Sequence, residues 1–243
     1  MSHSKVRQSH NTVTIVEPLR TLSIIIPTYN EAAKIESAIM DGLRQGAMEV
    51  IVSDGGSRDE TRAIVERLQT QHPTVLLINQ AHGRGRQLAA GARHASGDVL
   101  LFLHADNRLD ANASEQLAAR NWPTWGGFEQ RIDARGFRYR LLEWGNTARV
   151  KWTSRVFGDQ AMFVDRHAYQ QVGGFDEVDL MEDVMLSKKL KRIERAAVLP
   201  GKVIVDARRW HARGVVRQTL RNWFIQVAFA LGVSTQTLRR WYR

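Results

Sequence analysis

Residues 99–106, Val-Leu-Leu-Phe-Leu-His-Ala-Asp, decide the fold class of this chain, because they join an apolar run to two polar side chains. The run from 99 to 103 predicts a buried strand. His104 and Asp106 follow it, and alternate residues of an extended chain point the same way, so both can reach one site. Open α/β folds place ligands at the carboxyl ends of their strands. We therefore expect a site that could hold a hard cation here, although His104 could equally cap the turn or support a ligand.

Three further strands alternate with helices before residue 99. The strand signals are short apolar-rich runs at 22–26, 49–52 and 75–78. Pro27 is expected to end the first of them. Apolar residues at helical spacing predict helices at 31–43, from an Asp59 N-cap to about 69, and at 85–95. The order β-α-β-α-β-α-β predicts an α/β fold, a parallel sheet covered by helices on both faces.

The second half of the chain is less regular. Short strands are predicted at 126–129, 162–164 and 203–205, and a helix at 181–195. The tail from 218 to 243 is helical in pattern, basic and rich in aromatic residues. Such a tail can pack its apolar face on the protein or lie on an anionic membrane.

Composition narrows the class of protein. The 243 residues include no cysteine, which excludes a disulfide framework and thiolate metal sites and fits a reducing, cytoplasmic compartment. The formal net charge of +10 favours anionic partners such as nucleotide phosphates or an acidic membrane surface. No basic stripe points to nucleic acid. No apolar segment has the length of a signal peptide core or a spanning helix, so we expect a cytoplasmic protein that is at most peripheral on the inner face of the membrane.

Several polar motifs stand at the predicted strand ends in a fixed order. They are Pro-Thr-Tyr-Asn-Glu at 27–31, Ser-Asp-Gly-Gly-Ser at 53–57 and Leu-His-Ala-Asp at 103–106. Together they resemble the family 2 glycosyltransferases over roughly residues 21–215. Gly-Arg-Gly-Arg-Gln at 83–87 resembles a subgroup of small bacterial members, often named as arsenosugar-biosynthesis glycosyltransferases. The resemblance implies the GT-A fold, a Rossmann-like nucleotide-binding sheet with helices on both faces. We expect three parts: a flexible arm (1–20), indicated by its polar composition; the catalytic domain (21–215) that the resemblance covers; and a basic helical segment (216–243), packed on the domain or on a membrane surface.

The resemblance assigns the donor nucleotide to the ends of the first two strands. Pro27, Tyr29 and Glu31 match positions that flank the base and ribose. Asp54 matches the carboxylate that accepts a hydrogen bond from uracil, and an ionised carboxylate suits an imide N–H. The alternative for Asp54 is a turn former in an Asp-Gly-Gly loop.

Two arginines follow the third strand in a glycine-rich segment. Glycines before a helix let backbone N–H groups approach a phosphate, and Arg84 and Arg86 could add charge-assisted bonds to the donor. The alternative is a solvated basic turn.

The metal motif departs from the family pattern. Asp106 matches the last carboxylate of the D-x-D motif, which binds the cation and the diphosphate, whereas His104 replaces the first. One carboxylate together with substrate phosphates can still hold Mg²⁺ or Mn²⁺.

Acceptor-side residues are expected in the second half. Glu182 and Asp183 resemble the E-D motif, in which the aspartate is the catalytic base of an inverting transfer; here that residue is Asp183, and Glu182 would orient it. The alternative is a pair of acids favoured at a helix N-terminus. Asp159 could touch an acceptor.

Arg209 and Trp210 resemble the end of the Q-x-x-R-W motif of processive members and could cover the diphosphate or acceptor. Alternatively, Trp210 is a core residue and Arg209 a surface charge. Asp206 stands where that motif has glutamine. This departure and the lack of spanning helices favour a single, non-processive transfer.

The sequence thus predicts a metal-assisted, inverting transfer of a sugar from a nucleotide-diphosphate donor, UDP in particular, to a small-molecule or lipid-linked acceptor. One alternative is a nucleotidyltransferase of similar fold, although Pro27 to Asn30 replace the glycine-rich loop that those enzymes carry after strand one. Another is a non-catalytic protein that binds nucleotides or a membrane surface.

Overall fold

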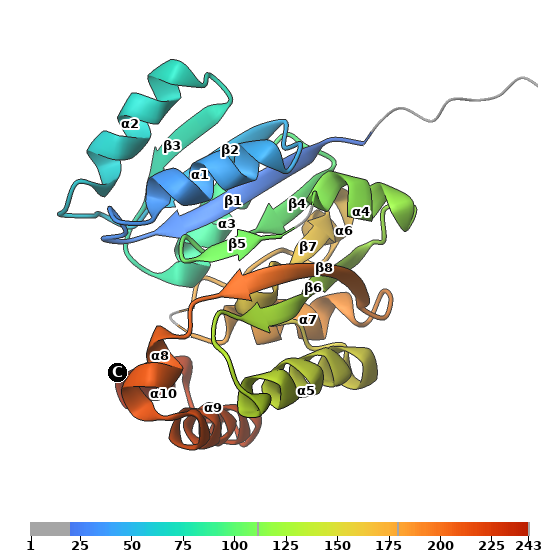
Figure 1. Ribbon diagram of the computed structural model, residues 1–243. Helices are drawn as coiled ribbons and strands as arrows, with labels where there is room; N and C mark the ends of the chain where they lie inside the picture. Colours follow the sequence, from blue (N-terminus) through green and yellow to red (C-terminus); the bar gives the residue numbers. More distant parts are fainter. Residues whose placement is uncertain (1–19, 111, 179, 243) are drawn as a thin grey trace, which may run out of the picture.

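A computed structural model describes residues 20–110, 112–178 and 180–242 (Figure 1). The predicted arm at 1–20 thus lies outside the described residues except for Arg20. The first half alternates strands and helices: β1 (Leu22–Thr28), α1 (Ile35–Arg44), β2 (Glu49–Asp54), α2 (Thr61–Gln71), β3 (Val75–Asn79), α3 (Arg84–His94) and β4 (Val99–Phe102). This order confirms the predicted β-α-β-α-β-α-β pattern.

The second half adds the other four strands and all the other helices of the described residues. Its elements are β5 (Asn107–Leu109), α4 (Ala113–Ala119), β6 (Trp125–Ile132), α5 (Phe137–Thr153), the 3-10 helix η1 (Gly158–Gln160), β7 (Phe163–Asp165), α6 (Arg166–Gln171), α7 (Glu182–Leu190), β8 (Ala197–Val205), α8 (Arg208–Arg213), α9 (Val215–Ala230) and α10 (Thr235–Tyr242).

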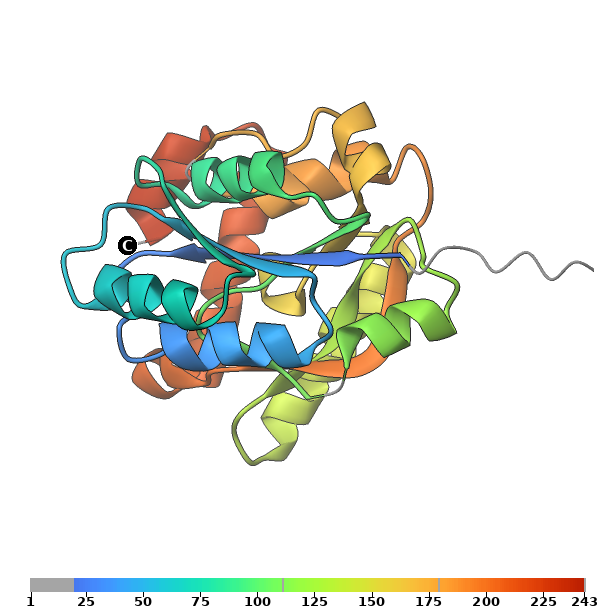
Figure 2. The same cartoon turned by 90° about the horizontal axis from the view of Figure 1, so that it is seen from above.

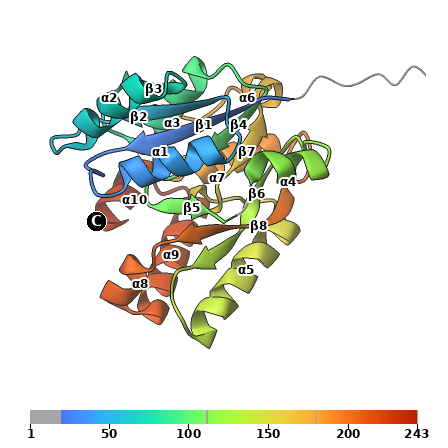
Figure 3. The same cartoon turned by 45° about the horizontal axis from the view of Figure 1, so that its top comes forward.

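The described strands form one eight-stranded sheet in the order β3-β2-β1-β4-β7-β6-β8-β5. The first four strands are parallel, as predicted. Beyond them the sheet is mixed, because β7 runs antiparallel to β4, β6 runs antiparallel to β7, and β6 and β8 are parallel. Figure 3 shows this second end of the sheet above α5, α8 and α9.

The core has two layers, one on each face of the sheet. Ile24 and Ile26 of β1 pack in one apolar cluster with α1 and α2, whereas Ile25 packs in the other with α3 and α7. This alternation follows from the two-residue repeat of a strand. Figure 2 shows α3 on one face of β1 and α1 and α2 on the other.

Pro27 does not end the first strand, which was predicted to stop at Ile26. β1 continues through Pro27 to Thr28, in register with Asp54 of β2. Ile25 O accepts from Leu103 N on the β4 side, and Thr28 O accepts from Gly55 N on the β2 side. Residue 27 therefore faces the β4 side, where pairing has already ended, and its missing N–H costs no ladder bond.

Asp59 is not the N-cap of α2, as had been predicted. Glu60 occupies that position, and Asp59 Oδ1 accepts from Thr61 N at 3.1 Å while its Oδ2 accepts from Ala32 N at 3.1 Å. Asp59 thus ties the start of α2 to the loop after β1, a contact that local sequence does not reveal.

The other predicted boundaries differ in length. The helix predicted at 31–43 begins only at Ile35, and the helix predicted at 181–195 spans Glu182–Leu190. The strands predicted at 126–129 and 203–205 extend to Trp125–Ile132 and Ala197–Val205 because β6 and β8 pair along their length. The predicted tail helix is two helices, α9 and α10.

No helix in the described part of the chain combines the length and apolarity that crossing a membrane requires.

Candidate functional site

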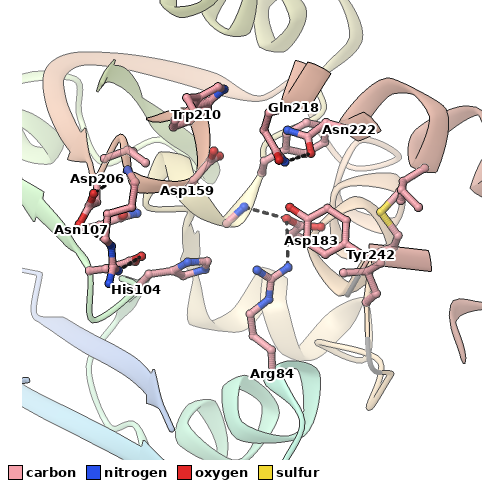
Figure 4. A pocket seen from close by; sticks show the side chains of 18 of the residues that line it. Arg84, His104, Asn107, Asp159, Asp183, Asp206, Trp210, Gln218, Asn222 and Tyr242 are labelled. Carbon is pink, nitrogen blue, oxygen red and sulfur yellow. Dashed lines mark hydrogen bonds and ion pairs between the residues drawn. The ribbon is translucent and has the colours of Figure 1, made fainter. Parts of the chain in front are cut away.

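A cavity of about 730 Å³ opens at the carboxyl ends of β1, β4 and β8. Its walls also include the starts of α3 and α7, the segment at η1, and the C-terminal helices α8 to α10. Figure 4 shows side chains from these elements pointing toward one another. The cavity therefore lies at the sheet edge where the sequence predicts a ligand site.

Three charged side chains meet on the α7 side of this cavity. Helix α7 begins after Met181, whose φ of 69° turns the chain into the helix. Asp183 Oδ2 accepts a hydrogen bond from Gly158 N at 2.8 Å and lies 3.8 Å from Arg84 Nη2 (Figure 4). Arg84 Nε donates to Glu182, whose side chain is fully buried. The resulting group holds Asp183 at the cavity wall with only 11% of its side chain exposed.

The charges in this group shift one another's pKa values. Burial raises the pKa of Glu182, and the adjacent Arg84 opposes that shift. Burial alone would lower the pKa of Arg84, but Glu182 and Asp183 outweigh it and raise the pKa of the guanidinium. Arg84 therefore stays cationic and balances two carboxylates.

His104 and Asp106 both line the cavity, as predicted, but not as alternate residues of a strand. β4 ends at Phe102, and His104 O accepts from Asn107 N at 3.0 Å in a turn. The ring of His104 packs against Gly158, where an added Cβ would lie 2.7 Å from His104 Nε2 and 3.6 Å from Asp183 Oδ2. The turn after β4 and the start of α7 thus meet at Gly158.

The oxygen ligands suited to a cation lie around Asp106. Burial and then the neighbouring Asp106 raise the pKa of Glu31, so two carboxylates face the same part of the cavity. Arg208 Nη2 lies 3.4 Å from Asp106 Oδ2. Within residues 20–110, 112–178 and 180–242, no cluster of three His, Cys, Asp or Glu side chains could hold a metal ion. The donor set accordingly fits Mg²⁺ or Mn²⁺ only where water and substrate phosphates supply the other ligands.

Four residues predicted to bind the donor lie outside the cavity lining: Pro27, Tyr29, Asp54 and Arg86. The Tyr29 ring is 39% exposed and packs against the His82 ring at 4.2 Å. Arg86 donates to His82 O at 3.2 Å. The predicted donor set is therefore divided, because Glu31 and Arg84 face the cavity and the other four do not.

Asp54 is fully buried at the end of β2. Its Oδ2 accepts from Gly56 N at 2.9 Å and from Ser57 N at 3.0 Å, and its Oδ1 accepts from Ser57 Oγ. Asp54 thus holds the turn that follows β2. Both of its carboxylate oxygens already accept hydrogen bonds, so a nucleotide base would have to bind in addition to these contacts.

Asp159 lines the cavity at the end of a buried polar chain. Its Oδ2 accepts from Gln130 Nε2 at 2.8 Å, Gln130 accepts from Asn146, and Asn146 accepts from Arg149 Nη1 at 2.8 Å. Burial raises the pKa of Asp159, with Arg149 opposing it, and burial lowers the pKa of Arg149 to about 10. Asp159 Oδ1 is buried and has no hydrogen-bond partner among the described residues.

Trp210 also lines the cavity and packs on Ile132, Tyr139 and Ala207, so it is both a wall and a core residue. The side chain of Arg209 lies outside the described part of the structure. Asp206 pairs with Lys34, which fastens the end of β8 to the start of α1.

Sequence reasoning missed the wall formed by α9 and α10. Gln218, Asn222 and Ile225 of α9 line the cavity with Tyr242 of α10. Ile225 packs with Met181 and Val184 at the start of α7. The sequence of α9 does show a stripe of polar residues at helical spacing. The residues around it do not indicate, however, that this stripe faces the cavity.

Comparisons with known proteins agree with this geometry. Residues 23–121, less than half of the chain, match the family model for glycosyl transferase family 2. The dolichyl-phosphate beta-glucosyltransferase ALG5A of Trichomonas vaginalis is 28% identical over 117 residues, which are 43% of this chain and 36% of that protein. Its relative ALG5C from the same organism is 28% identical over 107 residues, covering 39% of this chain and 32% of its own. The chain therefore spans about a third of the length of these curated relatives.

Solved structures extend the likeness of fold over three quarters of the chain. The mannosyltransferase PcManGT from Pyrobaculum calidifontis, in complex with GDP-Man and Mn²⁺, has a TM-score of 0.59 and 26% identity, covering 76% of this chain and 56% of its own. TarS 1–349 from S. aureus, in complex with UDP-GlcNAc, has a TM-score of 0.59 and 17% identity, covering 76% and 58%. The fold is GT-A, and these comparisons together support a family 2 glycosyltransferase.

Proposed function

We propose that this protein is an inverting glycosyltransferase that moves a sugar from a nucleotide-diphosphate donor, UDP-linked, to an acceptor hydroxyl in one non-processive transfer. The observation that carries the proposal is the placement of Asp183 and Asp106 on the walls of one cavity at the carboxyl ends of parallel strands. A base and a diphosphate-binding carboxylate on one cavity are what such a transfer needs.

The donor would enter from the side of β1 and β2. Tyr29 and Asp54 would contact the base, and the diphosphate would extend toward Asp106 in the cavity. Pro27 and Arg86 are further donor contacts in this proposal. The UDP-GlcNAc complex of TarS and the GDP-Man complex of PcManGT both support a nucleotide-sugar donor. Because the two donors carry different bases, UDP and GDP must be compared directly.

Asp106 and Glu31 are the residues that would hold Mg²⁺ or Mn²⁺, with His104 at the same turn. When bound, such a cation would supply positive charge against the leaving diphosphate. Arg208, exposed and 3.4 Å from Asp106, would add a second positive charge on that side.

Asp183 would act as the base. As the acceptor oxygen attacks the anomeric carbon, a carboxylate oxygen of Asp183 takes the hydroxyl proton, and the bond from that carbon to the diphosphate oxygen breaks from the opposite face. The nucleoside diphosphate leaves with the bonding pair, so the anomeric configuration inverts. Gly158 N–H fixes one oxygen of the carboxylate, and Arg84 holds Glu182 beside it.

The acceptor would lie between Asp183 and the C-terminal helices. Asp159 Oδ1, buried and without a partner in the described residues, could accept a hydrogen bond from an acceptor hydroxyl. Trp210 would form the wall opposite α7, with Arg209 next to it in the chain. The relatives named as dolichyl-phosphate glucosyltransferases make a lipid-linked acceptor the first class to test.

Residues 21–215 form the catalytic domain in this proposal, and residues 216–243 complete its acceptor side. A nucleotide-sugar donor and the absence of cysteine fit a cytoplasmic location.

The proposal is tested by calorimetric titration of UDP, GDP and ADP, each with and without Mn²⁺. We expect UDP to bind most tightly and Mn²⁺ to strengthen that binding. Equal, weak binding of all three with and without the metal ion would contradict the proposal. Hydrolysis of a UDP-sugar, measured as release of UDP, separates an enzyme from a protein that only binds nucleotides.

A further inference from the structure

Helix α9 presents two different faces. One face carries Gln218, Asn222 and Ile225, which line the cavity. The opposite face carries large apolar side chains that remain largely exposed; Trp223 is 66% exposed, and Leu231, just after the helix, is 81% exposed. One member of this face, Phe224, packs its ring against that of Trp241 at 5.6 Å. Members of this apolar row recur at helical spacing and are Val216, Leu220, Trp223, Phe224, Val227 and Leu231. A contiguous exposed row of this kind marks an interaction surface.

Arginines flank the apolar row. Arg213, Arg217 and Arg221 line a shallow hollow of about 340 Å³ beside it. Arg221 also donates to Trp241 O at 2.7 Å, which ties the arginine flank to α10. From Ala207 through Arg243 the sequence has eight arginines and no aspartate or glutamate. Residues 213–231 therefore combine an exposed apolar row with a flank of three arginines.

We propose that α9 docks the protein on an anionic lipid surface. The apolar row would enter the boundary between headgroups and acyl chains, and the arginine flank would contact lipid phosphates. Charge favours a lipid surface over a second copy of this chain. A second copy would bring its own Arg213, Arg217 and Arg221 against the same three arginines, whereas an anionic bilayer brings the opposite charge. The helix is too short to span a bilayer and has the composition of one that lies in its plane.

Docking in this orientation would place the cavity next to the lipid surface, because the cavity lies against the other face of α9 (Figure 4). Helix α5 lies with α9 at the lower end of the molecule in Figure 1, away from α2 and β3, and has its own exposed row of Phe137, Leu141 and Trp144. The inference does not rest on the proposed transfer reaction, since vesicle binding is measured without donor or acceptor.

The test is flotation of the full chain with vesicles of phosphatidylcholine alone or with one-third phosphatidylglycerol, at low and high salt. We expect binding to the anionic vesicles, weakened but not abolished by salt, and little binding to the neutral ones. No binding to either kind of vesicle would overturn the proposal.

Charge reversal tests the arginine flank. Arg217→Glu should weaken binding to anionic vesicles roughly 30-fold, since each basic residue near the surface contributes about a fivefold effect and the change spans two charges. Arg62→Glu on α2, at the end of the molecule away from α9 in Figure 1, changes the net charge equally and should leave binding nearly unchanged. Equal losses in the two variants would contradict docking through α9. Competition by millimolar inorganic phosphate that abolishes vesicle binding would likewise show a simple anion site instead.

Truncation tests the apolar row. Trp223→Ser should weaken vesicle binding roughly tenfold at high salt, where the electrostatic part is screened. Met48→Ser, at a residue that is 39% exposed before β2, is the matched control and should bind like the wild type. Two results together would show that the proposal is wrong and that α9 binds a second copy of the chain. The wild type would not bind vesicles, and sedimentation would show a dimer that Trp223→Ser converts to monomers.

Discussion

Arg84, the first residue of α3, forms an ion pair with Glu182, the first residue of α7, across 98 residues of sequence. Glu182 is fully buried, whereas about a third of the Arg84 side chain is exposed. The pair joins the glycine-rich segment, assigned from sequence to the donor phosphates, to the acids assigned to the acceptor side. Arg84 already pairs with the carboxylates of Glu182 and Asp183, which limits its ability to bind a donor phosphate as well.

Removing the cation should destabilise the fold. Arg84→Gln leaves the Glu182 carboxylate buried without its partner, and we expect a loss of about 1–3 kcal/mol in the free energy of unfolding, since Arg84 is partly solvated. Glu182→Gln in the same background should restore much of that loss. Urea unfolding of the two single variants and the double variant measures the coupling; strictly additive effects would show that the pair does not stabilise the fold.

The pH dependence of that loss has a definite sign. Burial raises the pKa of Glu182, so the folded state binds a proton on this carboxyl more readily than the unfolded chain does. Stability from such a proton is present at low pH and is lost as pH rises through the folded pKa. The deficit of Arg84→Gln relative to the wild type should therefore be largest at high pH, where Glu182 is ionised, and shrink in acid. A deficit that grows in acid would contradict this account.

Asp54 should contribute to nucleotide binding as well as to its turn. Asp54→Ala is expected to weaken UDP binding by roughly 1.5–3 kcal/mol, the contribution of a hydrogen bond to a charged acceptor. Because the carboxylate also holds Gly56 and Ser57, the variant should lose some stability too. Calorimetry and thermal unfolding separate the two effects. Reduced stability with unchanged UDP affinity would leave Asp54 only the turn-forming role.

The sequence was sufficient to predict the first half of the fold and the sheet edge at which the cavity opens. Continuous apolar strands, helical spacing and the polar residues at strand ends are local signals, and they correctly predicted four parallel strands; a cavity opens at their carboxyl edge. His104, Asp106 and Asp183 do line one cavity. The predictions that failed depend on contacts between distant segments. Pro27 continues its strand because pairing with β4 has already ended there, and Asp59 is bonded to Ala32 N and Thr61 N instead of being the N-cap of α2.

The mixed half of the sheet and the α9 wall could not be predicted, for a physical reason. β5, β6, β7 and β8 are ordered in space by pairings between segments far apart in the chain, such as Asn107 with Val205. Gln218 and Asn222 reach the cavity only because Ile225 on the same helix packs on α7. Such contacts have no signature in a short window of sequence.

The turn after β4 should control the dependence on a divalent cation. Asp106→Ala should abolish the strengthening of UDP binding by Mg²⁺ or Mn²⁺, because it removes a partly exposed carboxylate of the cavity wall that is proposed to bind the cation. His104→Asp should retain or tighten metal binding, since it supplies a further oxygen ligand. Titration of Mn²⁺ in the presence of UDP measures both. If the UDP affinity of the wild type is the same with and without the cation, the assignment of Asp106 to cation binding is wrong.

Gly158 should tolerate no side chain. A Cβ there would lie 2.7 Å from His104 Nε2 and close to Asp183, so Gly158→Ala should cost roughly 1–3 kcal/mol and lower kcat. Gly145→Ala in α5, where a Cβ meets nothing within 4 Å, is the matched control and should be neutral or slightly stabilising. If adding His104→Ala to Gly158→Ala restores nothing, the contact between the two residues is not the cause.

The most direct measurement of the central claim compares donor binding with sugar transfer in Asp183→Asn. The variant keeps the size of the side chain and can still accept the hydrogen bond from Gly158 N, but it cannot take a proton. We predict that it binds UDP with wild-type affinity and transfers sugar about 10²–10⁴-fold more slowly. Transfer at the wild-type rate would contradict the catalytic role of Asp183 and leave it only the structural role of an acid at the start of α7.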